Sequence, residues 1–485
     1  MAVTETGVLD DGPPPPGMTP GQRLRAILGG SAGNLVEWYD WSAYIFFTVY
    51  FAGHFFPEGD QTTQWLKAAA VSAVGFLARP LGAWLMGMYA DRAGRRAALT
   101  LSVSMMCAGS LIIALTPTYE TVGALAAVIL LGARILQGLS VGGEYGASAT
   151  YLSEMAGKNR RGFWSSFQYV TLIAGSLSAQ GMVVLLQKLM PDSALTEWGW
   201  RIPFFVGALL AVVVFWIRRG IDETVSFQRV EQHEPVNKVQ VAAVGGFLLL
   251  TAAAAVIAFT RPELGQAAWP ITVGLLILSL VALVAPLFRQ RPRETLMVMG
   301  LTAGGSLAYY VYTTYMQKFL INTSGFSKAT ASEIMLAALF CFMLMQPLFG
   351  WISDRIGRKP LLLYAFGGGM LATWPLLSAI AGTTNALAAF GLIMIALTFQ
   401  SGYSAISGLF KAEMFPAHIR ALGVALPYAI ANSVFGGSAE YVALAFKGAG
   451  HESNFYAYVS IVLAVGLLTV MLMPDTRKAS LITDD

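Results

Sequence analysis

Long apolar stretches, separated by short polar connections, make up most of this chain. A helix needs about 20 mostly apolar residues to cross a bilayer, and the sequence contains fourteen stretches near that length. The pattern therefore predicts an all-α membrane protein with about 14 transmembrane helices. The stretches lie near residues 31–52, 68–90, 97–115, 121–151, 162–187, 201–218, 239–259, 269–288, 295–317, 329–352, 361–381, 386–409, 420–446 and 454–473.

The composition supports a membrane protein. Of the 485 residues, 56% are hydrophobic and 12% are charged, whereas soluble proteins are about 45–50% apolar and about 25% charged. The basic residues are spread over many short loops, so no nucleic-acid partner is expected. Both cysteines fall in apolar stretches and all four histidines in polar connections, so neither a disulfide, a metal site nor a cofactor is predicted.

The distribution of basic residues predicts the orientation. If both termini are cytoplasmic, 22 of the 31 Lys and Arg residues lie on the cytoplasmic side and seven on the other side, while Arg79 and Arg134 lie within apolar stretches. Basic residues concentrate in cytoplasmic loops. We therefore predict a multi-pass protein of a bacterial inner membrane, with residues 1–30 and 475–485 as cytoplasmic tails.

A ten-residue basic loop occurs twice. Residues 87–96 read Gly-Met-Tyr-Ala-Asp-Arg-Ala-Gly-Arg-Arg, and residues 350–359 read Gly-Trp-Ile-Ser-Asp-Arg-Ile-Gly-Arg-Lys. Each copy lies between two apolar stretches. A repeat over such a long interval indicates two similar halves, and in a membrane chain it points to a transporter built from internal repeats.

A second pair of sequences repeats in the same way. Glu154 lies in a Ser-Glu-Met sequence shortly before a pair of arginines, and Glu413 lies in an Ala-Glu-Met sequence shortly before Arg420. Both glutamates fall at the ends of predicted helices. We expect them to pair with loop arginines and hold one closed state, which is a structural role.

The repeated basic loop resembles the signature between the second and third helices of each half in the major facilitator superfamily. The resemblance implies two six-helix halves, residues 31–220 and 295–474. The central linker, residues 221–294, then carries an inserted hairpin of two further helices, 239–259 and 269–288. These two helices contain no charge, and we interpret them as peripheral, lipid-facing packing.

The resemblance also implies transport by alternating access, in which the signature loops open and close on the cytoplasmic side. The gating residues expected from the two repeats are Asp91, Arg92, Arg95, Glu154, Asp354, Arg355, Arg358 and Glu413.

Three polar side chains share one face of the first apolar stretch. Glu37, Asp40 and Tyr44 are spaced by three and four residues, which places them on one side of a helix. An ionisable residue inside a membrane usually faces a cavity or a partner. Two carboxylates this close are not expected to be ionised together, so one suits a proton carrier. The alternative is that Glu37 only anchors a loop.

Two arginines lie inside apolar stretches. Arg79 is mid-way along the second, and Arg134 lies in the fourth, with Gln137 one turn later. An arginine fork donates two parallel hydrogen bonds to a carboxylate. It also needs a counter-charge when the substrate is absent, which Asp40 or Glu37 can provide. The arrangement resembles the sugar porters of the superfamily, whose first-helix carboxylate and fourth-helix arginine couple transport to protons. A permanent structural ion pair is the alternative.

Further polar residues complete the candidate site. Lys318 lies near the outer end of a tyrosine-rich stretch, where it either meets an anion or extends to the membrane interface. We predict substrate contact for Tyr44, Arg79, Arg134, Gln137, Tyr312 and Lys318, and proton coupling for Glu37, Asp40, Glu144 and Glu440.

Several sequences resemble one branch of the superfamily, the metabolite–proton symporters. They are residues 33–41, 134–146, 197–204 and 411–416. The resemblance covers both predicted halves but has no counterpart for the inserted hairpin. It implies a proton-coupled importer of a small dicarboxylate and no enzymatic activity. The match is closest to carriers of 2-oxoglutarate, which is therefore the expected substrate.

Other functions remain open from the sequence. Citrate, shikimate and a zwitterionic osmolyte such as betaine or proline are alternative substrates. The paired arginines favour an anion but do not choose among anions. A proton-driven drug exporter is a second alternative, since some exporters have fourteen transmembrane segments. A nutrient sensor that binds without transporting is the third. The expected surroundings are a lipid bilayer, a small anionic substrate and protons, and we expect a monomer.

Overall fold

The structure is a computed structural model. It describes residues 20–93, 95–141, 160–219, 278–416, 419–477 and 479–482, with a few single positions between these ranges. Within these residues the chain forms helices joined by short turns. Some predictions fall outside the described residues, namely Glu144, Glu154, the side chains of Asp91, Arg92 and Arg95, and most of the hairpin at 239–259 and 269–288.

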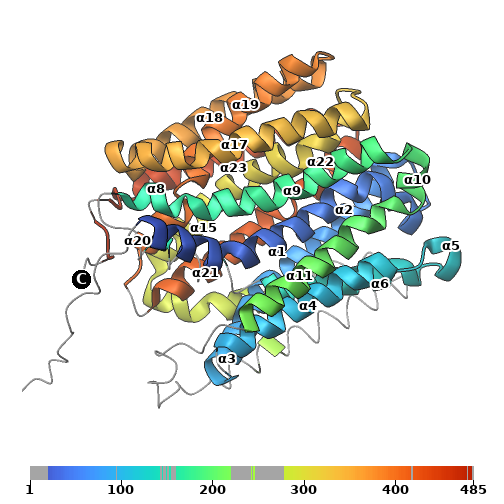
Figure 1. Ribbon diagram of the computed structural model, residues 1–485. Coiled ribbons are helices and arrows are strands. Elements are labelled where there is room, and N and C mark those ends of the chain that lie inside the picture. The colour runs from blue at the N-terminus through green and yellow to red at the C-terminus, as the bar shows by residue number, and fades with distance from the viewer. Residues whose placement is uncertain are drawn as a thin grey trace, which may run out of the picture.

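The first group of helices, here called the N-terminal set, runs back and forth along the bundle (Figure 1). It comprises α1 (Pro20–Phe55), α2 (Gln61–Leu77), α3 (Arg79–Ala93), α4 (Arg95–Leu115), α5 (Tyr119–Val122), α6 (Leu125–Val141), α8 (Arg161–Ser165), α9 (Phe167–Leu189), α10 (Asp192–Glu197), the turn η2 (Gly199–Arg201) and α11 (Ile202–Arg219).

The second group, here called the C-terminal set, repeats this course. It comprises α15 (Pro292–Tyr310), η3 (Val311–Tyr315), α16 (Met316–Asn322), α17 (Lys328–Ile356), α18 (Arg358–Gly382), α19 (Ala386–Ser404), α20 (Ser407–Glu413), α21 (Arg420–Ala431), η5 (Asn432–Gly436), α22 (Ala439–Gly448) and α23 (Glu452–Leu472). The end of the bundle at which α3 and α17 finish carries the repeated loops and is called the motif end below.

Short polar residues determine where several of these helices begin. The side chains of Asp60, Ser327 and Asn385 accept hydrogen bonds from backbone N–H groups in the first turns of α2, α17 and α19. The first N–H groups of a helix have no partner within it, and such caps satisfy them. All three caps lie at the end opposite to the motif end.

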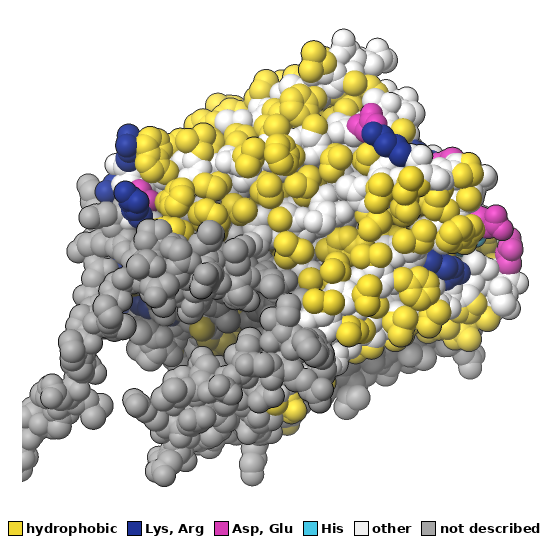
Figure 2. Space-filling view, in the orientation of Figure 1, with side chains coloured by type: hydrophobic (Ala, Val, Ile, Leu, Met, Phe, Trp, Pro, Cys, Tyr) yellow, Lys and Arg dark blue, Asp and Glu magenta, His cyan; other side chains and the backbone are white. Residues whose placement is uncertain are grey.

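The surface of the bundle is suited to a membrane. Six helices of the described chain are long and apolar enough to cross one. In Figure 2, hydrophobic side chains cover the middle of the described surface and charged side chains lie near its two ends. An apolar surface of this extent marks contact with a membrane or another protein.

The two sets meet along α9 and α17, which lie side by side in Figure 1. Opposite to the motif end, Gln180 donates to the backbone carbonyl of Ser332 at 3.1 Å, and Gln187 donates to its hydroxyl at 3.1 Å. Lys188 and Glu333 add an ion pair at 3.5 Å. These contacts join the two sets at that end.

A carboxylate joins the two sets at the motif end. Asp354 of α17 accepts hydrogen bonds from the backbone N–H groups of Gly162 at 2.7 Å and Phe163 at 2.9 Å, where α8 begins. A negative charge is favourable at a helix start. Arg358 lies 3.0 Å from Asp354 and 3.5 Å from Glu413. The described helices therefore meet at both ends and enclose the region between them.

One helix of the central linker is described, at Leu278–Gln290. Its residues Leu283 and Val284 are buried with Leu426 of α21 in a small apolar cluster, and Trp84 of α3 packs on this cluster. Val281, on the same helix, is 55% exposed. The helix thus has one face on the bundle and one exposed face.

The close approach of α17 to α8 leads to a first prediction. A side-chain carbon on Gly350 would meet the carbonyl oxygen of Gly162, and it would lie 2.9 Å from Cβ of Ser166. Overpacking such a contact costs about 1–3 kcal/mol, so Gly350→Val should separate the two sets at the motif end. A cysteine replacing buried Ser353 should then react with N-ethylmaleimide about tenfold faster.

The labelling would use a chain in which Cys107 and Cys341 are replaced by serine. Gly367→Val is the matched control, because its new carbon would meet only Leu467, at 3.8 Å. Equal labelling rates in the two valine variants would contradict a role of the Gly350 contact in closing this end.

Candidate functional site

A buried carboxylate lies at the centre of a polar network within the N-terminal set. Asp40 of α1 is 2% exposed. It accepts a hydrogen bond from the Ser110 hydroxyl of α4 at 2.5 Å and another from the Gln137 amide of α6. One carboxylate therefore connects three helices that are distant in sequence.

Gln137 connects Asp40 to Arg134. Its Oε1 accepts a hydrogen bond from Arg134 Nη1 at 2.8 Å, while its Nε2 donates to Asp40. The guanidinium of Arg134 is fully buried and lies 3.6 Å from the ring centre of Trp41 and 4.2 Å from that of Tyr44. Aromatic faces stabilise a desolvated cation. The opposite charges are thus coupled through an amide.

Arg79, at the start of α3, lies among aromatic rings. Its guanidinium is 4.1 Å from the ring centre of Trp41, 4.2 Å from Phe76 and 5.4 Å from Trp38. The residue is 5% exposed, yet its Nε and Nη2 atoms have no hydrogen-bond partner within the described residues. A buried, charged donor without a partner is costly. The arrangement is therefore suited to an anion that comes from outside the protein.

The C-terminal set provides the facing wall. The ring of Tyr310 lies 5.2 Å from that of Phe76, and Ser433 donates to the Phe76 carbonyl at 2.6 Å. The Tyr310 hydroxyl and Oδ1 of Asn432 are buried and make no hydrogen bond of regular geometry in the described part of the chain, although Tyr310 lies close to both Asn432 and Arg79. They adjoin the π-helical turns η3 and η5, and such turns are frequent at functional sites. Polar atoms of the C-terminal set therefore lie close to the Arg79 guanidinium of the N-terminal set.

Lys318 and Glu440 form an ion pair inside the C-terminal set, between α16 and α22. Their side chains are 1% and 12% exposed. The sequence suggested Lys318 for substrate contact and Glu440 for proton coupling, separately. In this enclosed state Lys318 and Glu440 neutralise each other's charge. The predicted roles in substrate contact and in proton coupling therefore concern one ion pair.

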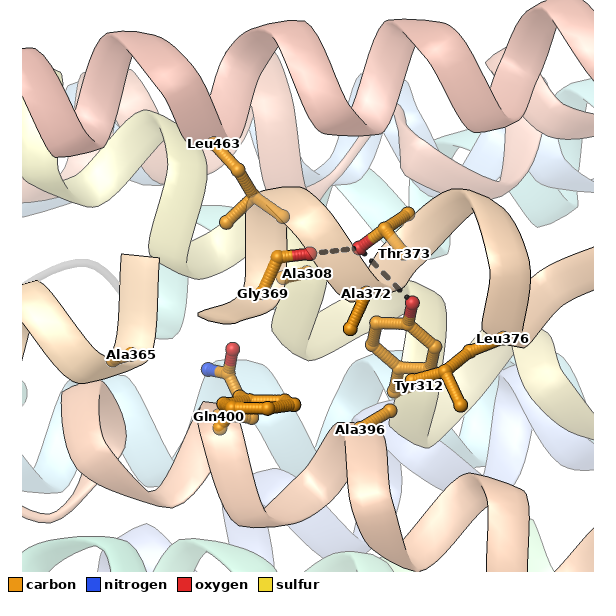
Figure 3. Close-up of a pocket in the computed structure, with 11 residues that line it drawn as sticks. Ala308, Tyr312, Ala365, Gly369, Ala372, Thr373, Leu376, Ala396, Gln400 and Leu463 are labelled. Carbon is orange, nitrogen blue, oxygen red and sulfur yellow. Dashed lines mark hydrogen bonds between the residues drawn. The ribbon is translucent and has the colours of Figure 1, made fainter. Parts of the chain in front are cut away.

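Tyr44 and Tyr312 both hydrogen-bond within their own sets. The Tyr44 hydroxyl donates to the carbonyl of Ala68 at 3.0 Å, and the Tyr312 hydroxyl donates to Thr373 at 3.1 Å. Tyr312 also lines a cavity between α15, α18 and α19, whose other polar side chains are Thr373 and Gln400 (Figure 3). The cavity holds about 20 Å³, roughly the room for one water molecule, so it is too small for a dicarboxylate.

Four of the predicted gating residues have described side chains. Asp354, Arg358 and Glu413 form the network at the motif end, where Glu413 also accepts a hydrogen bond from Thr476 at 2.6 Å. Arg355 instead lies over the ring of Trp351, 3.7 Å from its centre. Their part in gating stays a prediction.

Sequence reasoning missed Lys411, because it follows the apolar stretch 386–409 and looks like a loop residue. The structure buries it completely in α20, where its ammonium donates to Ser407 at 2.8 Å, Tyr145 at 3.3 Å and Tyr403 at 3.4 Å. The apolar pair Leu-Phe just before it is the signal that could have predicted a buried position.

The predicted residues thus fall into distinct places. Asp40, Gln137 and Arg134 are in direct contact, and Trp41 connects them to Arg79 because its ring lies against both guanidinium groups. Glu37 is buried on the same helix as Asp40, at 4% exposure.

Comparison with known proteins decides the family. Residues 27–483 match the family model described as Sugar (and other) transporter. The chain belongs to this family. It is a membrane transporter and not an enzyme.

Curated relatives of this transporter carry small solutes. It is 49% identical over 457 residues to the alpha-ketoglutarate permease of Escherichia coli (strain K12), covering 94% of this chain and 95% of that one. It is 29% identical to the proline/betaine transporter of the same organism, covering 99% and 87%. It is also 29% identical to the citrate-proton symporter of Klebsiella pneumoniae, covering 92% and 91%.

Solved structures agree on the fold. The xylose transporter XylE from E. coli, in a partially occluded inward open conformation, matches with a TM-score of 0.66 at 17% identity, covering 93% of this chain and 98% of that one. A peptide transporter POT in complex with sulfate matches with a TM-score of 0.64 at 15% identity, covering 93% and 96%. This transporter therefore has the all-helical major facilitator fold.

The Gln137 bridge leads to a second prediction. Gln137→Leu keeps the volume but removes one buried hydrogen bond from Asp40 and one from Arg134. Breaking a buried charge network costs about 3–5 kcal/mol, so the melting temperature in detergent should fall by several degrees, and solute uptake should fall about tenfold or more.

Gln400→Leu is the matched control, because its amide donates to the backbone carbonyl of Gly305 at 3.0 Å. If both leucine variants lose the same stability and activity, the bridge between Asp40 and Arg134 has no special role.

Proposed function

We propose that this transporter imports a small dicarboxylate together with protons, and that the dicarboxylate is 2-oxoglutarate. The observation that carries the proposal is the Arg79 guanidinium, buried between the two sets with two unpartnered donor atoms in the described structure. A carboxylate supplies both the missing charge and two acceptors in matching geometry. The 49% identity to an alpha-ketoglutarate permease supports this substrate.

Asp40 is the proposed site of proton coupling. When ionised, it balances the charge of Arg134 through Gln137, as the hydrogen bonds indicate. Protonation of Asp40 removes that negative charge, so an anion in the site then stabilises the Arg134 guanidinium. Proton and anion then enter together, because each favours the other. Tyr44 positions Arg134 through its ring, and buried Glu37 is a second candidate carboxylate.

We propose that the Asp354, Arg358 and Glu413 network is the latch at the motif end, with Arg355 beside it. Alternating access requires that contacts break at one end while those at the other end hold. By the repetition of the loop, Asp91, Arg92, Arg95 and Glu154 act in the N-terminal set, and Glu144 stays a candidate for proton coupling. Tyr312, Lys318 and Glu440 enter the cycle only if their present hydrogen bonds open.

The principal rival is another solute. A citrate-proton symporter and a proline/betaine transporter are each 29% identical to this chain. The unpartnered arginine favours citrate over betaine, because a quaternary ammonium would lie beside a second positive charge. A drug exporter and a non-transporting sensor are further rivals, and the uptake experiment below separates them.

Uptake by reconstituted protein is the third prediction. In proteoliposomes, radiolabelled 2-oxoglutarate should accumulate only with an inward proton gradient, and unlabelled 2-oxoglutarate should compete whereas betaine should not. Arg79→Lys keeps the charge but loses the fork, so uptake should fall about tenfold or more. Asp40→Asn should abolish gradient-driven accumulation while leaving exchange of internal for external 2-oxoglutarate measurable.

Arg201→Lys is the matched control, because Arg201 donates to the backbone carbonyls of Ala114 and Thr116 and lies over the ring of Trp200, which is not among the proposed site residues. Gradient-driven uptake of citrate without 2-oxoglutarate would reject the proposed substrate. Normal uptake by Arg79→Lys would reject the proposed site.

We also propose about 14 transmembrane helices, both termini in the cytoplasm of a bacterial inner membrane, and a monomer. The fourth prediction tests the hairpin. Two extra crossings place Gly265 on the outer side, so Gly265→Cys should react with a membrane-impermeant maleimide in intact spheroplasts, whereas a cysteine in the N-terminal tail should not. Protection of Gly265→Cys until the cells are broken would mean that the hairpin does not cross.

A further inference from the structure

Lys411 is a buried cation to which the proposed transport cycle has given no role. Its side chain is fully buried, and none of the ion pairs among the described residues includes it. Its three hydrogen bonds go to the neutral hydroxyls of Ser407, Tyr145 and Tyr403. The ammonium therefore has no counter-charge in the described part of the chain, and a buried charge with only neutral partners is costly in a membrane protein.

Aromatic rings surround the same ammonium. Nζ of Lys411 is 4.3 Å from the ring centre of Tyr428 and 5.3 Å from that of Tyr145. These rings belong to different sets, and they stack with centres 3.6 Å apart and planes 8° apart. Ring faces hold a cation without neutralising it, so the ammonium is retained here while its negative partner is missing.

Tyr428 is a neighbour of both Lys411 and Arg79. Tyr428 interacts electrostatically with both Arg79 and Tyr310. It lies one helical turn nearer to the motif end than Asn432, since α21 begins at the motif end with Arg420. Among the described residues, Arg79 and Lys411 are therefore two buried cations that have no carboxylate partner and share Tyr428 as a neighbour.

We infer that Lys411 binds the second carboxylate of the substrate, while Arg79 binds the first. This inference rests on the proposed function and deepens it, because two buried cations that share an aromatic neighbour suit the two charges of a dicarboxylate. The incoming carboxylate takes the place of the Tyr145 hydroxyl on the ammonium. It thereby loosens the Tyr145–Tyr428 contact between the two sets. Binding of the second carboxylate is thus coupled to opening at the motif end.

The inferred site distinguishes ligands by their number of carboxylates. A monocarboxylate satisfies Arg79 and leaves Lys411 without a counter-charge, whereas a dicarboxylate satisfies both. A binding site rejects a ligand that leaves one of its buried polar groups without a partner. The site should therefore reject a monocarboxylate.

The fifth prediction compares two ligands that differ only at the second carboxylate. They are 2-oxoglutarate and 2-oxopentanoate, each titrated calorimetrically into the full-length protein in detergent. Lys411→Gln keeps hydrogen bonding to the hydroxyls but removes the charge. It should raise the dissociation constant of 2-oxoglutarate about tenfold or more and leave that of 2-oxopentanoate within about twofold. Lys411→Arg, which keeps the charge, should retain most of the preference for 2-oxoglutarate.

Lys447→Met is the matched control, because it removes a cation that pairs with Glu452 at the opposite end, and both affinities should stay unchanged. Equal weakening of both ligands by Lys411→Gln, or no weakening of either, would overturn the inference. Failure of the proposed function appears separately, as absence of gradient-driven 2-oxoglutarate uptake by the wild-type protein. If Lys411→Gln does not fold, the ratio of the two affinities in Lys411→Arg decides, and loss of the preference there overturns the inference.

Discussion

The cost of an uncompensated charge in a low-dielectric interior is the constraint on which this structure depends. Asp40 and Arg134 meet it by sharing Gln137, so that neither charge is isolated. Lys318 meets it by pairing with Glu440. Arg79 has no such partner in the described structure and is surrounded by rings instead. A buried guanidinium with free donor atoms among the described residues is suited to bind an anion.

The same constraint links binding to movement. The Arg79 guanidinium belongs to the N-terminal set, while the nearby Tyr310 hydroxyl and the side-chain Oδ1 of Asn432 belong to the C-terminal set. The two sets are held together at the motif end by Asp354 on the start of α8. An anion bound between the two sets changes the electrostatic balance between them. The hydrogen bonds of Asp354 can be exchanged for hydrogen bonds to water when the sets separate.

Much of the candidate site could be predicted, because charged residues within apolar stretches are rare and conspicuous. Arg79, Arg134 and Asp40 were identified in this way, and the structure buries all three. Ser110 and Trp41 could not be identified, since a serine or a tryptophan in an apolar helix is ordinary. Lys411 was missed for a different reason. Helix boundaries are the weakest part of a sequence analysis, and an error of a few residues turned a buried lysine into a loop residue.

The sequence by itself determined the class of the protein, the repeat of its basic loops and the residues that carry charge inside the membrane. These are local properties, set by the length of apolar stretches and by residue types. Tertiary structure alone decided the partners. Lys318 meets Glu440 across 122 residues, and Lys411 meets Tyr145 across 266 residues. Such pairings depend on how helices pack, because a side chain in a membrane interior accepts any partner of suitable charge that packing brings within reach.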